Sequence, residues 1–250
     1  MKNAEVPNQG SSDNRLRNEI GHGRVIAENA GEIWHWGSPA GKRRWSRRVE
    51  MLTSHISPGM SVLELGCGTG YYTRELEKTG ALITAIDISP DLLNIASSTI
   101  SSHNVTFRVN NAYAMDFDNE LFDTVIGISV LHHLDIEKAL SEVYRVVKTG
   151  GIVKFSEPNM LNPQIALERN VPALRKMMHN SPDETAFFKW EIRNLLLKAG
   201  FKKVSVTPFD FLHPAVPAPL VPFVARLTES LEQIPVLQEI AGSLYIQAKK

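Results

Sequence analysis

The chain has 250 residues, in which 27 acidic side chains balance 27 basic ones, so the formal net charge at pH 7 is zero. A neutral chain exerts no general attraction on nucleic acids or anionic membranes, and a single cysteine excludes an intramolecular disulfide. The polar first residues lack a secretory signal pattern, and no apolar run has the length of a membrane span. We therefore expect a cytoplasmic protein without a transmembrane segment.

The first 60 residues precede the regular part of the pattern. Residues 1–20 are polar and aperiodic, which is typical of a flexible N-terminus. We assign 21–60 to a helical cap, with one helix at 24–33 and another after Ser38 and Pro39, which suit an N-cap and a first helical position. Apolar residues at helical spacing predict the buried face of that second helix: Trp45, Val49, Leu52 and Ile56.

Basic residues occupy much of the same helix between positions 42 and 48. Two interpretations of this cluster are open. It is a phosphate-binding patch of the kind that nucleic-acid enzymes use, or it is a solvated helix face.

Residues 61–70, SVLELGCGTG, hold the most informative pattern. A short apolar strand runs into Gly66, Gly68 and Gly70, and a helix is predicted over 71–80. Glycines in such a turn let the backbone approach a ligand. A second strand over 82–89 contains Asp87, about 20 residues downstream, where a carboxylate can hold a ribose diol. The pattern predicts a nucleotide-binding α/β fold.

Strands and helices alternate through the rest of the chain. Further strands are predicted at 105–110, 122–129, 152–158, 202–208 and 243–249. Further helices are predicted at 91–100, 136–148 and 190–201. Two segments, 161–185 and 209–242, interrupt this alternation. The second is rich in proline and apolar residues, and a lid over the substrate, a subunit interface, peripheral membrane contact and additional core all remain open for it.

The glycine turn is followed, in order, by NNAYAMDF (110–117), FDTVIGISVLHHL (122–134) and RVVKTGGIVKFSEPN (145–159). Together they resemble class I S-adenosylmethionine-dependent methyltransferases, in particular the small-molecule branch that includes quinone-biosynthesis enzymes. The resemblance implies an α/β, Rossmann-like fold. Its seven-stranded, mostly parallel sheet has an antiparallel last strand, helices on both faces and a helical cap. Residues 61–160 would form the cofactor-binding core, and 161–250 would complete the sheet.

The resemblance also implies S-adenosylmethionine as cofactor, a small-molecule acceptor and no metal. The glycines would let the backbone approach the methionine part, Glu64 would orient its ammonium group, and Asp87 would accept from both ribose hydroxyls. Asn111 stands where the family has an acidic residue, so its contact with adenine should be weaker. The implied cofactor residues are Glu64, Gly66, Cys67, Gly68, Gly70, Asp87, Ile88, Asn111, Ala112, Ser129 and Val130.

His132 and His133 follow the fourth predicted strand directly. An imidazole can take a proton from a hydroxyl or an activated carbon acid, so both are candidate catalytic bases. A structural role is the alternative, because alignment of donor and acceptor often suffices for methyl transfer. Four residues are candidates for the acceptor pocket, with core or surface roles equally open: Trp36, Tyr72, Glu157 and Asn159.

Three other functions compete with a small-molecule methyltransferase. An RNA or DNA methyltransferase would use the 42–48 cluster, but the Asn/Asp-Pro-Pro-aromatic motif is missing where SVLHHL stands. A nicotinamide-dependent oxidoreductase is disfavoured by the G-x-G-x-G spacing. A non-catalytic S-adenosylmethionine-binding module is the third. The sequence leaves open the acceptor, the methylated atom (oxygen, nitrogen or carbon) and the oligomeric state.

Overall fold

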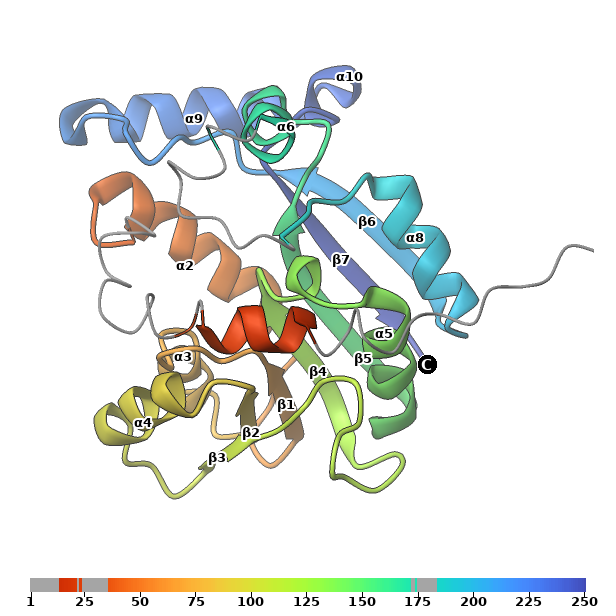
Figure 1. Cartoon of the computed structure of the whole chain (residues 1–250). Helices are drawn as coiled ribbons and strands as arrows, with labels where there is room; N and C mark the ends of the chain where they lie inside the picture. The colour runs from red at the N-terminus through yellow and green to blue at the C-terminus, as the bar shows by residue number, and fades with distance from the viewer. Residues whose placement is uncertain (1–13, 22, 24–35, 172–173, 175–183) are drawn as a thin grey trace, which may run out of the picture.

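The computed structural model describes residues 14–21, 23, 36–171, 174 and 184–250. One seven-stranded sheet runs through the molecule in the order β3-β2-β1-β4-β5-β7-β6 (Figure 1). The strands are β1 (Ser61–Leu65), β2 (Leu82–Asp87), β3 (Val105–Val109), β4 (Phe122–Ile128), β5 (Val147–Pro158), β6 (Lys202–Phe209) and β7 (Ser243–Lys249). Strands β1 to β5 are parallel, and β7 is antiparallel to β5 and β6. The predicted sheet is confirmed.

Helices cover both faces of this sheet. They are α2 (Pro39–Thr53), α3 (Thr73–Glu77), α4 (Pro90–Thr99), α5 (Ile136–Val146), α6 (Pro163–Asn170), α8 (Lys189–Lys198), α9 (Val221–Leu231) and α10 (Pro235–Gln238), with short 3₁₀ turns η1 (Leu131–His133) and η2 (Ala218–Leu220). Leu140 of α5 and Leu196 of α8 belong to one apolar core. Leu52 of α2 and Leu76 of α3 belong to a second. Full burial of such a leucine contributes about 1.5–3 kcal/mol.

Local chemistry explains where the helices begin. The Ser38 hydroxyl accepts the Gly41 N–H at 2.9 Å with Pro39 at the first helical position, so the predicted cap of α2 is confirmed. The end of α5 differs from the prediction. The helix stops at Val146 and β5 begins at once with Val147, because that residue pairs with Phe122 of β4 next to a shift in register.

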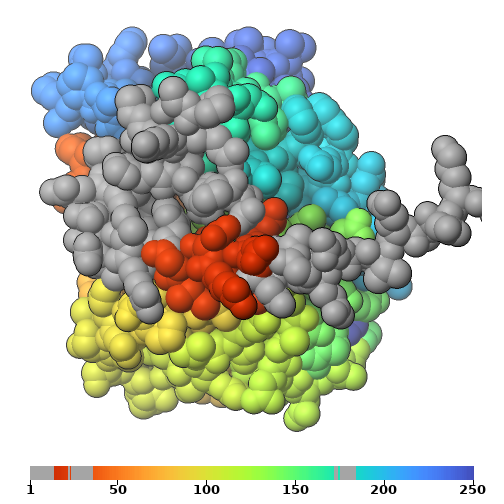
Figure 2. Space-filling model, in the orientation of Figure 1, coloured from red at the N-terminus to blue at the C-terminus, as the bar shows by residue number. Residues whose placement is uncertain are grey.

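Residues 14–21 form a helix that the sequence did not lead us to predict (red in Figure 1). It lies at the surface of the face that Figure 2 shows. Glu19 Oε2 lies 3.0 Å from His133 Nδ1, and Arg15 donates to the carbonyl of Leu134, so the helix contacts the segment after β4. The helix expected at 24–33 lies outside the described residues.

The segment 209–242 packs against α2 through a small apolar cluster that contains Ala40, Val221 and Ala225. Its carboxylates pair with the arginines of α2. These pairs are Arg43 with Glu229, Arg44 and Arg48 with Asp210, and Arg47 with Glu232. Both interpretations of the 42–48 cluster therefore need correction. The arginines form neither a phosphate-binding patch nor a purely solvated face, because acidic residues of the same chain neutralise them.

Helices α6, α9 and α10 gather at one end of the molecule (Figure 1). Asn159 ties this end together, since its side-chain amide donates to the carbonyls of Glu239 and Ala241 at 2.9 and 2.7 Å. On α9, Phe223 is 70% exposed and Leu227 is 50% exposed, so the outward face of this helix is apolar. Among the helices in the described ranges, none has the length and hydropathy needed to cross a bilayer.

Candidate functional site

The carboxyl end of β1 opens into a turn whose glycines have positive φ. Gly66 and Gly68 have φ values of 67° and 54°, a left-handed conformation that glycine adopts at little cost. A β-carbon at Gly66 would lie 2.4 Å from Cγ2 of Val130, whereas one at Gly68 would meet no atom within 4 Å. The backbone at Gly68 thus has room for a ligand to approach. Cys67 is buried, and burial raises the pKa of its thiol, so it is not poised as a nucleophile.

Asp87, the last residue of β2, braces this turn from the neighbouring strand. Its Oδ2 accepts the Gly68 N–H and its Oδ1 accepts the Ser89 N–H, both at 2.9 Å. Burial raises the pKa of Asp87, although the hydrogen bonds from Ser89 and Gly68 act in the opposite direction. A carboxylate oxygen has more than one acceptor site, so Asp87 can also accept from a ribose diol. Ile88, the next residue, is half-buried.

Glu64 lies inside β1, two residues before the turn, and is only 2% exposed. Its Oε2 accepts a hydrogen bond from the Thr73 hydroxyl at 2.7 Å. Burial raises the pKa of Glu64 to about 8, and the charge of Asp87 acts in the same direction. At neutral pH Glu64 is therefore mostly protonated, and an ammonium group beside it would favour the ionised form.

The adenine side of the predicted site is formed after β3. Oδ1 of Asn111 accepts the Tyr113 N–H at 2.9 Å, which leaves this amide oxygen one lone pair for an adenine amino group. Ala112 is 9% exposed and belongs to the core below. Asn111 and Ala112 thus lie directly after β3, where the sequence predicts the adenine contact.

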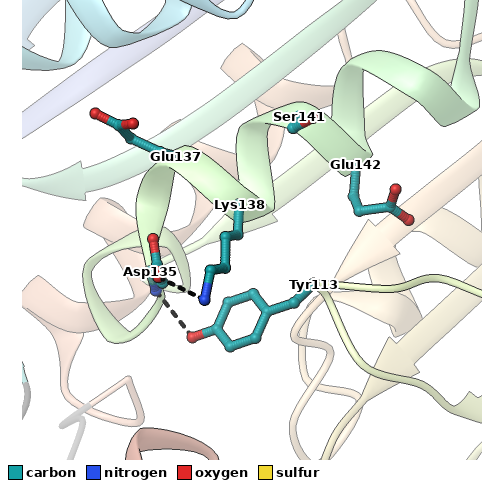
Figure 3. A pocket seen from close by; sticks show the side chains of 6 residues that line it. All are labelled: Tyr113, Asp135, Glu137, Lys138, Ser141 and Glu142. Atoms are coloured by element: carbon teal, nitrogen blue, oxygen red, sulfur yellow. Dashed lines mark hydrogen bonds and ion pairs between the residues drawn. The ribbon is translucent and has the colours of Figure 1, made fainter. Parts of the chain in front are cut away.

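Tyr113 also borders a surface hollow of about 600 Å³ against α5 (Figure 3). Tyr113 Oη accepts the Asp135 N–H at 2.8 Å, and Lys138 Nζ lies 3.4 Å from Asp135 Oδ2. The remaining lining residues are Glu137, Ser141 and Glu142. Since this hollow is lined by polar groups of α5 and not by the glycine turn, we assign no chemistry to it.

Ser129 and Val130 follow β4 directly, and Val130 packs against the glycine turn at Gly66. Ser129 has a φ of 52°, which is uncommon for a residue with a side chain and often marks a functional segment. Glu157 of β5 holds this segment, because its Oε1 accepts the N–H groups of Val130 and Leu131 at 3.0 and 2.9 Å. Glu157 is fully buried, so its observed contacts position the backbone beside the turn.

His132 lies between two carboxylates. Its Nδ1 is 2.7 Å from Glu157 Oε2, and its Nε2 is 3.3 Å from Glu184 Oε1. Burial alone would lower the pKa of His132, but the hydrogen bonds to Glu157 and Glu184 outweigh it and raise the pKa to about 9. At neutral pH the ring is therefore a cation that donates from both nitrogens, which does not favour the proton-accepting role expected from the sequence.

His133 lies against His132, with 4.2 Å between the ring centroids. Its Nδ1 is 3.0 Å from Glu19 in the helix 14–21. The charge of His133 also reaches the other side of the site, where it acts to lower the pKa of Asp87. His133 thus lies between His132 and the helix 14–21.

Two further residues complete this group and were not predicted. Arg169 of α6 places Nη2 2.8 Å from Glu184 Oε1. Burial alone would raise the pKa of Glu184, but the hydrogen bond from His132 and the charges of His133, His132 and Arg169 hold it well below its usual range. Neither Arg169 nor Glu184 lies in a recognisable motif, so no local signal in the sequence could have identified them.

The ligand atoms of His132, His133 and Glu184 lie within 4.8 Å of one another, close enough to consider a metal ion. Two imidazoles and a carboxylate are ligands that zinc or iron accepts. The guanidinium of Arg169 lies 2.8 Å from the same carboxylate oxygen, however. Since a positive group already neutralises Glu184 there, the arrangement opposes a divalent cation.

The remaining candidates for the acceptor pocket lie in different places. Trp36 and Tyr72 meet through Trp45, with ring-centroid distances of 5.1 and 5.7 Å. Tyr72 is buried, and among the described residues its hydroxyl has no hydrogen-bond partner. Asn159 is also buried and uses its amide to hold the 209–242 segment. The structure therefore brings Trp36 close to Tyr72, and Glu157 close to His132. Asn159 has a structural role, because its amide binds the 209–242 segment.

Comparisons with known proteins identify the family of the chain. Residues 63–155 match a family model described as a methyltransferase domain. A demethylmenaquinone methyltransferase from Tropheryma whipplei is 30% identical over 194 residues, which cover 69% of this chain and 81% of that protein. A malonyl-[acyl-carrier protein] O-methyltransferase from Serratia marcescens is 32% identical over 111 residues, or 44% of this chain and 42% of that protein.

A solved structure from Thermotoga maritima, described as an S-adenosylmethionine-dependent methyltransferase and possible histamine N-methyltransferase, has the same fold. It superposes with a TM-score of 0.65 at 19% identity, covering 92% of this chain and 99% of that one. The family uses S-adenosylmethionine as cofactor. The chain belongs to the class I S-adenosylmethionine-dependent methyltransferases of the quinone-biosynthesis type.

Proposed function

We propose that this methyltransferase acts on a small phenolic or quinol-type acceptor with an apolar body, at an oxygen or a ring carbon. The observation that carries the proposal is the buried polar group around His132, which begins two residues after Val130. Because Val130 contacts the glycine turn, this group adjoins the end of the cofactor site where the methyl group is expected. The relative named as a demethylmenaquinone methyltransferase supports the same acceptor class.

The donor side follows from the residues already described. Asp87 would accept from the ribose hydroxyls, Glu64 would face the ammonium group, and Asn111 would accept from adenine. S-adenosylmethionine supplies a methyl group that is already activated on a sulfonium. The chain then needs chiefly to align the acceptor and to exclude water.

His132 and His133 have different proposed roles on the acceptor side. His132 contributes a positive charge, because Glu157 and Glu184 keep its ring protonated. His133 contacts Glu19, so it would help to hold the helix 14–21 against the acceptor side. Neither role requires the imidazole to accept a proton from the acceptor.

We extend the proposal to the segment 209–242. Its inner face is fixed to α2 by ion pairs, while Phe223 and Leu227 are exposed. An outward apolar face supports peripheral contact with the body of a hydrophobic acceptor or with the membrane that dissolves it. The enzyme would then work from the cytoplasm.

The test is a methyl-transfer assay with donor labelled in its methyl group. The acceptors are demethylmenaquinol, catechol, malonyl-[acyl-carrier protein] and transfer RNA, each at equal concentration. We expect label in demethylmenaquinol or catechol. Transfer to RNA or to the acyl-carrier protein alone would contradict the proposal.

A further inference from the structure

Arg169 is a buried cation whose hydrogen-bonding capacity is only partly used. Its side chain is 10% exposed, and Nη2 lies 2.8 Å from Glu184 Oε1. Nε and Nη1 are also buried, and among the described residues neither has a hydrogen-bond partner. A guanidinium carries donors on all three nitrogens and has no acceptor. Leaving two of these nitrogens buried and unpaired is unfavourable unless a ligand accepts from them.

The neighbours of Arg169 limit the charge of such a ligand. Glu184 links it to His132, and Glu157 lies on the other side of that imidazole. With His132 protonated, two cations balance two carboxylates in this chain of contacts. His133 adjoins the group, and its Nδ1 contacts Glu19. Because the group has no net charge, it can bind a ligand with one negative charge through the Arg169 donors. A phosphate with two or more negative charges would leave an excess of negative charge there.

The same contacts bear on how the acceptor is activated. His132 donates from both nitrogens to carboxylates, so it is not available to remove a proton. A phenol can still react if its ionised form is the one that binds, with its proton released to solvent. The ionised oxygen then holds a full negative charge, which increases the nucleophilicity of that oxygen and of the adjacent ring carbon.

We propose that Arg169 binds the ionised oxygen of a phenolic or enolic acceptor through Nε and Nη1, while Glu184 holds the guanidinium in place. The inference rests on the proposed function, because it concerns the acceptor of that reaction. Arg169 contacts the acceptor directly, and Glu184 and His132 are positioning residues.

The experiment measures ionisation of a bound phenol. The probe is 4-nitrophenol, whose phenolate is yellow, added to the full chain in the presence of S-adenosylhomocysteine. Preferential binding of the phenolate should lower the pKa of the bound probe by about one unit or more, a preference of about tenfold. Arg169→Gln should abolish this shift. Arg169→Lys keeps a cation for Glu184 but has fewer donors, so it should retain less than half of the shift.

Arg193 is the matched control, because it is an exposed arginine on α8, and Arg193→Gln should behave like the parent protein. Calorimetry with S-adenosylhomocysteine should give the same affinity for all variants within about twofold, which verifies the fold. An unshifted probe in the parent protein, or an equal shift in Arg169→Gln, would overturn the inference. The methyl-transfer panel judges the proposed function separately, because phenolic acceptors can be methylated whether or not Arg169 contributes.

A second arm distinguishes the ionised phenol from other anions. Benzoate, inorganic phosphate and the uncharged 4-nitroanisole are each titrated as competitors of the probe. We expect 4-nitroanisole and phosphate to bind at least about tenfold more weakly than 4-nitrophenolate binds. Tighter binding of benzoate that depends on Arg169 would overturn the phenolate assignment in favour of a carboxylate.

Discussion

Two arginines of this protein, Arg48 and Arg169, both pair with carboxylates inside the fold. They differ in how many of their nitrogens have hydrogen-bond partners. On α2, Arg48 is 4% exposed, and its Nη2 bonds to both Asp210 and Ser243 Oγ while Nη1 donates to the Arg44 carbonyl. On α6, the Arg169 side chain is 10% exposed and bonds to Glu184 through a single nitrogen. The first arginine lies between α2 and the 209–242 segment, and the second lies beside His132.

The extent of hydrogen bonding separates a structural arginine from an arginine that binds a ligand. A buried ion pair with hydrogen bonds to several partners holds two parts of the fold together, and removal of one partner leaves an uncompensated charge. A buried arginine with spare donors has a cost that only a ligand can offset. Positive charge alone, which first drew attention to residues 42–48, does not distinguish the two cases.

The largest expected effect comes from breaking the paired group. Asp210→Asn removes the charge that faces both Arg44 and Arg48, and asparagine tolerates the φ of 76° at this position. We expect a loss of about 3–5 kcal/mol in the free energy of unfolding, measured in denaturant. Arg43→Met is the control, because its side chain is 57% exposed, and it should cost less than about 1 kcal/mol. Equal losses would mean that burial does not separate these pairs.

Asp87 combines the two kinds of role, because it accepts hydrogen bonds from the backbone and can still accept from a ligand. Asp87→Ala should lower the affinity for S-adenosylhomocysteine by at least tenfold, which corresponds to about 2–4 kcal/mol for a charge-assisted pair of hydrogen bonds. The variant also loses the contacts to Gly68 and Ser89. Asp87→Asn keeps one acceptor oxygen, so its affinity for S-adenosylhomocysteine should lie between that of the parent protein and that of Asp87→Ala. Calorimetry that finds unchanged affinity in Asp87→Ala would remove this residue from the site.

The sequence predicted the parts of this molecule that depend on neighbours along the chain. The glycine turn, the Ser38 cap and the apolar strand of Val62, Leu63 and Leu65 all carry local patterns of spacing, and these elements lie where expected. Pairs between distant segments could not be predicted. Arg48 and Asp210 are 162 positions apart, and nothing in either local sequence specifies its partner.

The candidate site also has one part that local sequence patterns predict and another part that depends on distant segments. Asp87 and the glycines lie within one strand–turn–helix–strand unit, so their convergence follows from the pattern. His132 lies in a predicted segment, but its protonated state depends on Glu184, 52 residues away. A chemical role inferred from residue type alone does not specify the charge of the ring, because tertiary contacts set that charge.

Glu64 gives a smaller effect that depends on pH. In the free protein its pKa is raised to about 8, so at pH 7 the carboxyl group holds a proton that an ammonium ligand would displace. Binding of S-adenosylhomocysteine should release a proton, and the affinity should rise about fivefold between pH 7 and pH 8. Calorimetry in two buffers of different ionisation enthalpy measures the release. Glu64→Gln should bind with little pH dependence in this range, and an equal rise in that variant would assign the effect to another group.

The smallest expected effect concerns the stability of the partly paired group. Arg169→Gln removes an ion pair with Glu184, but that carboxylate keeps its contact with His132. The same substitution removes buried guanidinium nitrogens that have no partner among the described residues. Because these two contributions oppose each other, we expect the free energy of unfolding to change by less than about 1 kcal/mol in the ligand-free protein. A loss as large as that of Asp210→Asn, measured under the same conditions, would show that Arg169 holds the fold as Arg48 does, and that spare donors do not identify a binding arginine.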